Sequence, residues 1–190
     1  MIRAFIAIEL QNENTIENIN SFSSRLKQNQ TKIKLVEPEN LHLTVKFLGN
    51  ISESLARQIF NVLKNEINED MFKGKNFNYK LKGVGQFNKF SVIWVKLIGD
   101  NQFLQQVKNS IETILSEKMN VPRDNRAQFK PHLTIGRLKK DKINYQTFSA
   151  LKNLIIEHKD FEFGPFTIEK VVLKKSVLTP KGPVYSDLVY

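Results

Sequence analysis

The chain has 190 residues, no cysteine, and 29 Lys and Arg against 19 Asp and Glu, which gives a formal net charge of +10 at pH 7. The lack of cysteine excludes disulfides, thiolate nucleophiles and thiolate metal sites, and the ordinary content of apolar and charged residues excludes a disordered chain. No apolar run approaches the ~20 residues of a membrane-spanning helix, and the N-terminus turns polar too early for a secretion signal, so we expect a cytoplasmic protein with no membrane association.

The first half of the chain is expected to begin with two strands that alternate with two helices. Ile2–Leu10 is dense in β-forming apolar residues, which is typical of a strand buried on at least one face. Apolar residues then recur every three or four positions across Asn12–Asn29, which predicts an amphipathic helix. Leu41–Gly49 alternates in the manner of a strand, and Ser52 can cap a second helix that reaches Ile67.

The first half ends with an expected hairpin of strands Phe77–Phe87 and Phe90–Gly99 turning at Asn88-Lys89, which gives the order β-α-β-α-β-β. The second half is similar, with the order α-β-α-β-β. Its expected elements are a helix Asn101–Met119, a strand His132–Leu138, a helix Tyr145–His158, and strands Phe166–Leu178 and Val184–Tyr190 joined by a turn at Thr179–Pro183. Helices that alternate with hairpins of strands indicate an α+β fold, with helices on the outer face of each antiparallel sheet. No linker rich in Pro, Gly or Ser divides the chain, so we expect residues 1–190 to form one bilobal domain with an approximate two-fold axis and a central cleft.

One short motif occurs once in each half of the chain. His-Leu-Thr followed by a β-branched residue begins at His42 and again at His132, although the chain has only three histidines. Alternation puts His42, Thr44 and Lys46 on one face of the first strand and Phe47 on the other. If the two halves face each other, the two histidines meet across the cleft with their threonines beside them.

The second motif strand raises the question of where Arg137 points. Alternation groups His132, Thr134 and Gly136 on one face, which leaves Arg137 on the apolar face. A bulge, or the end of the strand near Gly136, would instead turn Arg137 toward the cleft.

Two facing histidines suit the chemistry of a phosphodiester. One group must take a proton from the nucleophile and another must give a proton to the leaving oxygen, and histidine, with a pKa near 6.5, can do both near neutral pH. Threonine hydroxyl groups and a nearby arginine can hold the phosphoryl oxygens. No HExxH motif or acidic cluster lies near either motif and there is no GxSxG, so we expect neither a metal nor another cofactor. The third histidine, His158, lies at the end of a predicted helix and is assigned a structural role.

Together with the opening "RAFIAIEL", the extended motif "NLHLTVKFLG" and the ending "LKKSVLTPKGPVYSDL", the two motifs resemble the 2H phosphoesterases, specifically the RNA 2′,3′-cyclic phosphodiesterases once described as 2′-5′ RNA ligases. The resemblance covers essentially the whole chain. It implies a bilobal α+β fold and metal-independent hydrolysis of a terminal 2′,3′-cyclic phosphate to a 2′-phosphate, with 2′-5′ joining of RNA as a minor reaction. It also implies that His42 is the proton donor and His132 the proton acceptor.

The resemblance extends to the residues that bind the substrate. It implies that Thr44 and Thr134 hydrogen-bond phosphate oxygens and that Arg137 neutralises the phosphoryl charge. The phenylalanines that could stack on a terminal base are Phe5, Phe47 and Phe87, with core packing as the competing role for each.

The expected partners follow from this chemistry and from the positive charge. We expect the protein to act as a monomer on RNA 3′ ends, or on nucleotides, that bear a 2′,3′-cyclic phosphate. Two alternatives remain open at this stage. One is a phosphodiesterase acting on a small cyclic or 2′-5′-linked nucleotide, and the other is a non-catalytic module that binds RNA ends; the presence of both histidines favours an enzyme.

Overall fold

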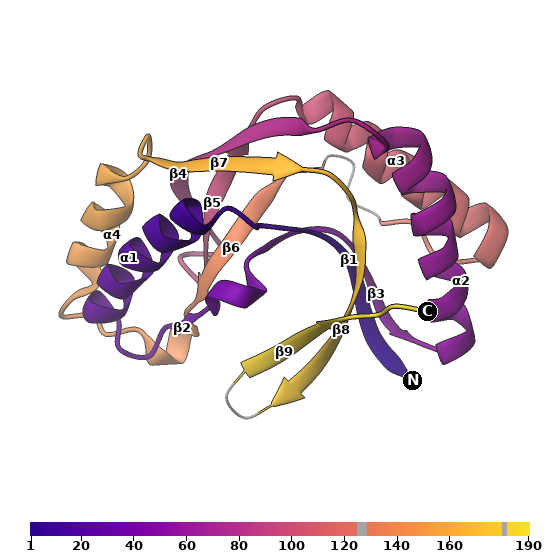
Figure 1. The fold of residues 1–190 in the computed structure, drawn as a ribbon. Coiled ribbons are helices and arrows are strands. Elements are labelled where there is room, and N and C mark those ends of the chain that lie inside the picture. The colour runs from indigo at the N-terminus through magenta and orange to yellow at the C-terminus, as the bar shows by residue number, and fades with distance from the viewer. Residues whose placement is uncertain (125–128, 180–181) are drawn as a thin grey trace.

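The computed structural model describes residues 1–124, 129–179 and 182–190 (Figure 1). Its strands are β1 (Ile2–Glu9), β2 (Lys34–Leu35), β3 (His42–Ile51), β4 (Phe77–Phe87), β5 (Val92–Ile98), β6 (His132–Arg137), β7 (Glu162–Ile168), β8 (Val172–Thr179) and β9 (Gly182–Asp187). Its helices are α1 (Glu13–Asn29), α2 (Glu53–Val62), which continues as the π-helix η2 (Leu63–Phe72), α3 (Asn101–Met119) and α4 (Phe148–Glu157), with short 3-10 turns η1 (Pro38–Asn40) and η3 (Lys140–Lys142). Within the described ranges, no helix is both long and apolar enough to cross a membrane.

The described strands form one curled antiparallel sheet, which confirms the α+β class (Figure 1). Its order is β7-β4-β5-β6-β3-β1-β8-β9, with β2 beside β6. The two strands that carry His-Leu-Thr, β3 and β6, are therefore neighbours at the centre of the sheet, where Leu43 pairs with Leu133. From the sequence we expect a separate sheet in each lobe. The structure instead has one sheet, in which the strands of the two lobes meet where β3 pairs with β6.

One lobe contains β7, β4, β5 and β6, the other contains β3, β1, β8 and β9, and each half of the chain contributes to both lobes. The helix that follows β1, α1, packs on β6 and β7 beside α4, and these helices cover the β4-β5-β6-β7 side (Figure 1). On the other side α2 packs on β1 and β8, and α3 is tied to β3 by an ion pair between Lys46 and Glu112 (Figure 1). Each of the two longest helices thus follows a strand of one lobe and covers the strands of the other.

Three of these helices are capped at their N-termini by the side chain of an Asn, Ser or Asp. Asn12, Ser52 and Asp100 accept hydrogen bonds from backbone N–H groups in the first turns of α1, α2 and α3. The apolar faces of the helices pack against buried strand residues such as Leu43, Val95 and Leu133. We call the opposite face of the sheet, which bears His42, Thr44, His132 and Thr134, the histidine face.

The expected strand Phe166–Leu178 is wrong, because two strands occupy this region. β7 pairs with β4, whereas β8 pairs with β1 in the other lobe. The break falls where the side-chain amide of Asn68 donates to the carbonyl of Val171 and accepts from its N–H, so Val171 needs no strand partner.

Two predicted turns have different outcomes. The turn expected at Asn88-Lys89 is a four-residue loop between paired Phe87 and Val92, and Asn88, Lys89 and Phe90 all have left-handed φ, from 50° to 68°. Of the turn predicted at Thr179–Pro183, residues 180 and 181 lie outside the described residues.

Candidate active site

A β-bulge directly after the first His-Leu-Thr sets which side chains share the histidine face. Thr44 and Lys46 pair with consecutive residues of β1, so Val45 is an extra residue on β3. A bulge reverses the alternation of side chains. Lys46 therefore points to the helices and is 2% exposed, whereas Phe47 is 59% exposed on the histidine face. The predicted faces of Lys46 and Phe47 were wrong because simple alternation assumes a regular strand.

The same irregularity occurs after the second motif. Thr134 and Gly136 pair with consecutive residues of β5, so Ile135 is the extra residue on β6. This is the bulge that the sequence required for Arg137 to turn toward the cleft, and it places Arg137, which is exposed, on the histidine face. Gly136 faces the core, where a Cβ atom would lie 3.0 Å from a side-chain carbon of Ile33.

The direct pairing of Leu43 with Leu133 brings the two motifs together. Both leucines are buried on the helix-covered face, so the residues on either side of them project from the histidine face. In an antiparallel pair with this register, His42 is opposite Thr134 and Thr44 is opposite His132. The two histidines thus lie diagonally across the join, each beside a threonine of the neighbouring strand.

His42 is held at both ring nitrogens. Its Nδ1 lies 2.6 Å from the carbonyl oxygen of Asn40, and its Nε2 lies 3.0 Å from Oγ1 of Thr44. Since a carbonyl can only accept, Nδ1 carries a proton and donates it, and Nε2 is the nitrogen directed to Thr44. The ring packs against Phe5 and Tyr185, with ring centroids 5.0 and 5.3 Å away.

The surroundings of His42 make its imidazolium a stronger acid than an exposed one. Burial lowers the pKa of His42 below its ordinary value of 6.5. The hydrogen bond to Asn40 works against this shift, and the positive charge of Lys174 adds to it. The net effect is a lowered pKa for His42.

His132 has a matching arrangement. Its Nδ1 lies 2.7 Å from the carbonyl oxygen of Lys130, which, like Asn40, is two residues before the histidine. The ring contacts Phe87 and Trp94, with centroids 5.0 and 6.0 Å away. Each histidine therefore has its Nδ1 on a backbone carbonyl and two aromatic neighbours, as the approximate two-fold relation between the motifs leads one to expect.

Positive charge gathers around the His42 end of the site. Arg137 is close enough to lower the pKa of both His42 and Tyr185, and Arg3 also acts on Tyr185, although burial holds the pKa of Tyr185 above its usual range. Lys174 is buried and bonded to the carboxylates of Glu9 and Asp187, 2.6 Å from the latter. Arg3 is thus a second arginine near the predicted phosphate site.

The three predicted base-stacking phenylalanines lie in different surroundings. Phe5 is 3% exposed and packs on His42, which fits core packing, the competing role, and its ring supports the histidine. Phe47 is exposed on the histidine face, and half-buried Phe87 lines a cleft beside His132. Sequence reasoning missed Tyr185 and Trp94, the other aromatic neighbours of the histidines, because aromatic residues in strands usually signal core.

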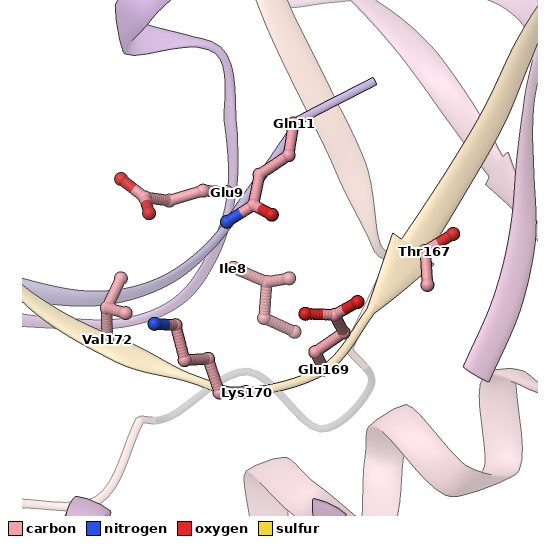
Figure 2. A pocket seen from close by; sticks show the side chains of 7 residues that line it. All are labelled: Ile8, Glu9, Gln11, Thr167, Glu169, Lys170 and Val172. Atoms are coloured by element: carbon pink, nitrogen blue, oxygen red, sulfur yellow. The ribbon is translucent and has the colours of Figure 1, made fainter. Parts of the chain in front are cut away.

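Two hollows lie near these residues. The larger, about 770 Å³, opens beside His132 between β5 and the first half of α3. The smaller lies where β1 ends against the β7–β8 connection, with Glu9, Gln11, Glu169 and Lys170 around it (Figure 2). At about 10 Å³ it has room for about one water molecule and cannot take a nucleotide. Among the described residues, no group of three or more His, Asp and Glu side chains could hold a metal ion.

A sheet joined along two matched histidine strands is the fold of the two-histidine, or 2H, phosphoesterases. A family model described as "AKAP7 2′5′ RNA ligase-like domain" matches residues 4–186, and the chain belongs to this family. The chain is 37% identical over 187 residues to the RNA 2′,3′-cyclic phosphodiesterase of Methanocaldococcus jannaschii, covering 97% of this chain and 96% of that protein. It is 31% identical over 192 residues to the protein of the same name from Aquifex aeolicus, covering 98% and 94%.

Solved structures share the fold. TT0787 of Thermus thermophilus superposes with a TM-score of 0.73 at 24% identity, covering 99% of this chain and 96% of that one. E. coli LigT complexed with 3′-AMP superposes with a TM-score of 0.71 at 21% identity, covering 99% and 95%.

Proposed function

We propose that this protein is an RNA 2′,3′-cyclic phosphodiesterase that opens a terminal cyclic phosphate to a 2′-phosphate with His42 as acid, His132 as base and no metal ion. The observation that carries the proposal is the matched tethering of the two histidines. Each donates Nδ1–H to a backbone carbonyl two residues earlier, which makes Nε2 the reacting nitrogen of each ring at the join of β3 and β6. The shared name of the relatives at 31% and 37% identity supports the choice of substrate.

The proposed reaction moves two protons and exchanges one bond. Nε2 of His132 takes a proton from water as the water oxygen bonds to phosphorus. The bond between phosphorus and the 3′ oxygen breaks, and Nε2 of His42 gives its proton to that oxygen. The product carries a 2′-phosphate, and the histidines return to their starting states by exchanging protons with solvent. A 5′-hydroxyl group in place of water gives a 2′-5′ linkage, which is the minor joining reaction.

The neighbouring side chains have defined parts in this proposal. Thr44 and Thr134 donate hydrogen bonds to the phosphoryl oxygens, and Arg137 offsets the charge that builds on them. Arg3 is a second cation at the same end of the site. The lowered pKa of His42 makes its imidazolium a better proton donor to the 3′ oxygen.

The substrate is an RNA 3′ end or a nucleotide with a 2′,3′-cyclic phosphate. Exposed Phe47 on the histidine face offers a ring to a base of that strand, and stacking of this kind tolerates any sequence. We propose that residues 1–190 act as one bilobal domain and as a monomer.

Replacement of each histidine tests the proposal. We expect His42→Ala and His132→Ala each to lower turnover of a short RNA with a 2′,3′-cyclic phosphate by about 10²- to 10⁴-fold. The matched control is His158→Ala, because His158 lies away from the join, with Nδ1 2.8 Å from the carbonyl of Leu154 and Nε2 3.0 Å from Arg25. His158→Ala should keep turnover within about two-fold at a temperature where circular dichroism shows it folded. Unchanged turnover in either site variant would contradict the mechanism.

A further inference from the structure

We infer that the cleft beside His132 binds the nucleoside that carries the attacking hydroxyl group in 2′-5′ joining, so that it is an acceptor site separate from the site of the cyclic phosphate end. This inference rests on the proposed function. Its first support is position. The described residues that line the cleft come from β4, β5, the first half of α3 and residues 129–132, and none of them comes from β3 or β1. Because β3, β6 and β5 are consecutive neighbours, His42, His132 and the cleft follow one another across the sheet.

This order matches the geometry of phosphoryl transfer. The attacking and leaving oxygens lie roughly in line on opposite sides of phosphorus. With His42 at the leaving 3′ oxygen, the sugar and base of the cyclic end lie on the His42 side, and the group activated by His132 arrives from the cleft side. On this measure of volume a water molecule needs only about 10 to 15 Å³, whereas sites for small organic ligands measure about 300 to 1,000 Å³. A cleft of about 770 Å³ is therefore far larger than hydrolysis requires and is suited to a nucleoside.

The lining has the chemical groups that a nucleoside with a 3′ phosphate would use. Aromatic rings, side-chain amides and ammonium groups surround the cleft, and no carboxylate is among the described residues that line it. The aromatic residues are Phe87, Trp94 and Phe129, the amides are Asn101, Gln102, Gln105 and Asn109, and the cations are Lys96 and Lys130. Rings can stack on a base, amides can pair with its edges, and ammonium groups attract the phosphate that follows.

Two details place this lining next to the reacting atoms. Lys96 and Trp94 pair with His132 and Thr134, so their side chains share the histidine face with the proposed base. The ring of Trp94 also lies against the ring of His132, with centroids 6.0 Å apart.

The step balances without a further reactant. The 5′-hydroxyl group of the bound nucleoside gives its proton to Nε2 of His132 as its oxygen bonds to phosphorus. The bond from phosphorus to the 3′ oxygen of the cyclic end breaks, and His42 protonates that oxygen. One phosphodiester replaces another, so the number of phosphate ester bonds is unchanged.

The test compares joining with hydrolysis in a single reaction. The donor is a 5′-phosphorylated RNA ending in a 2′,3′-cyclic phosphate, which has no 5′-hydroxyl of its own, and the acceptor is a dinucleotide with a free 5′-hydroxyl. The unmodified protein should show joining that saturates as the dinucleotide concentration rises. Gln102→Trp fills the cleft from an exposed position on α3, and we expect it to lower the ratio of joined to hydrolysed product at least ten-fold. Asn109→Trp should do the same.

The matched control is Gln106→Trp, an exposed glutamine of α3 that does not line the cleft, which should leave the ratio unchanged. Methanol is the chemical control, because it is too small to need the cleft, and its ratio of methyl ester to hydrolysed product should be the same in all these proteins.

The other possible outcomes contradict either the acceptor site alone or both the acceptor site and the proposed function. Joining that is absent or unsaturated in a hydrolytically active protein, or equal ratios in Gln102→Trp and Gln106→Trp, overturns the acceptor site alone. A ten-fold rise in KM of Gln102→Trp for a mononucleoside 2′,3′-cyclic phosphate shows that the cleft holds the cyclic end instead, and this also overturns the acceptor site. An absence of hydrolysis in the unmodified protein overturns the proposed function and the acceptor site with it.

Discussion

The buried charges behind β3 predict a large loss of stability from one isosteric change, Glu112→Gln. The carboxylate of Glu112 lies 2.6 Å from Nζ of Lys46 and 3.0 Å from Nζ of Lys108, whose side chains are 3% and 4% exposed. In Glu112→Gln, Lys108 keeps an ion pair with Asp124 at 3.2 Å. Among the described residues Lys46 keeps no carboxylate, and only neutral acceptors remain, the carbonyl of Pro122 at 2.9 Å and the single oxygen of the new amide. Removing one partner of a buried ion pair costs about 3 to 5 kcal/mol, because the other charge stays buried without compensation.

The shift in melting temperature follows from that magnitude. For a chain of 150 to 250 residues, about 1 kcal/mol corresponds to about 2 to 4 °C, so we expect a drop of about 6 to 20 °C. Thermal and urea unfolding followed by circular dichroism measure both quantities. The control is Glu117→Gln on the same helix, because Glu117 is 68% exposed and 3.8 Å from Arg123. Glu117→Gln should change stability by no more than about 0.5 kcal/mol.

The effect should also depend on pH. Burial alone would raise the pKa of Glu112, but hydrogen bonds from Lys46 and Lys108 outweigh burial and hold it below its ordinary value of 4.5. The stabilising contribution of the carboxylate is therefore complete above pH 4.5 and is lost as pH falls through the lower pKa of the folded state. The difference between the parent and Glu112→Gln should shrink in that acidic range. A loss below about 1 kcal/mol at neutral pH would refute the assignment of a buried, paired charge.

Three further predictions concern the site itself. The imidazole of His42, followed by NMR, should titrate below 6.5 because of its burial, and kcat/KM should fall as pH rises through that pKa, since the acid must be protonated; a midpoint at or above 6.5 would contradict this. Arg137→Ala should lower kcat/KM for the cyclic phosphate by about ten- to one-hundred-fold, with Arg137→Lys retaining part of it; equal activity of Arg137→Ala and the parent would remove Arg137 from the site. Phe47→Ala should raise KM for an RNA oligonucleotide by at least about five-fold, and an unchanged KM would exclude stacking on Phe47.

The repeated motif predicted the centre of the fold. His42 and His132 could be placed on strands because each is followed by alternating apolar residues. Their pairing could not be foreseen, because the two halves were expected to face each other, whereas β3 and β6 are neighbours in one sheet. The position of Arg137 could be foreseen only as a condition, since a bulge leaves no local mark in a run such as Leu-Thr-Ile-Gly. The identical bulge at Val45 was not foreseen and reversed the faces of Lys46 and Phe47.

Long-range contacts account for what the sequence did not reveal. Tyr185 belongs to the last strand and reaches His42 through the order β3-β1-β8-β9, which no local pattern encodes. The bonds that Lys174 makes with Glu9 and Asp187 likewise join residues far apart in the chain. The break between β7 and β8 depends on Asn68, whose amide replaces a strand partner for Val171. The exchange of helices between lobes has the same origin, because it follows from strand order and not from helix periodicity.

The most direct test of the account is to identify the product formed at an RNA end. A short RNA with a 2′,3′-cyclic phosphate is incubated with the purified protein in the presence of EDTA, and the 2′-phosphate and 3′-phosphate products are resolved. The account predicts the 2′-phosphate alone, at a rate that EDTA does not change, because two histidines perform the acid and base steps. A 3′-phosphate product would mean that the 2′ oxygen leaves, and loss of activity in EDTA that a divalent ion restores would mean that a metal takes part; either result would contradict the two-histidine mechanism.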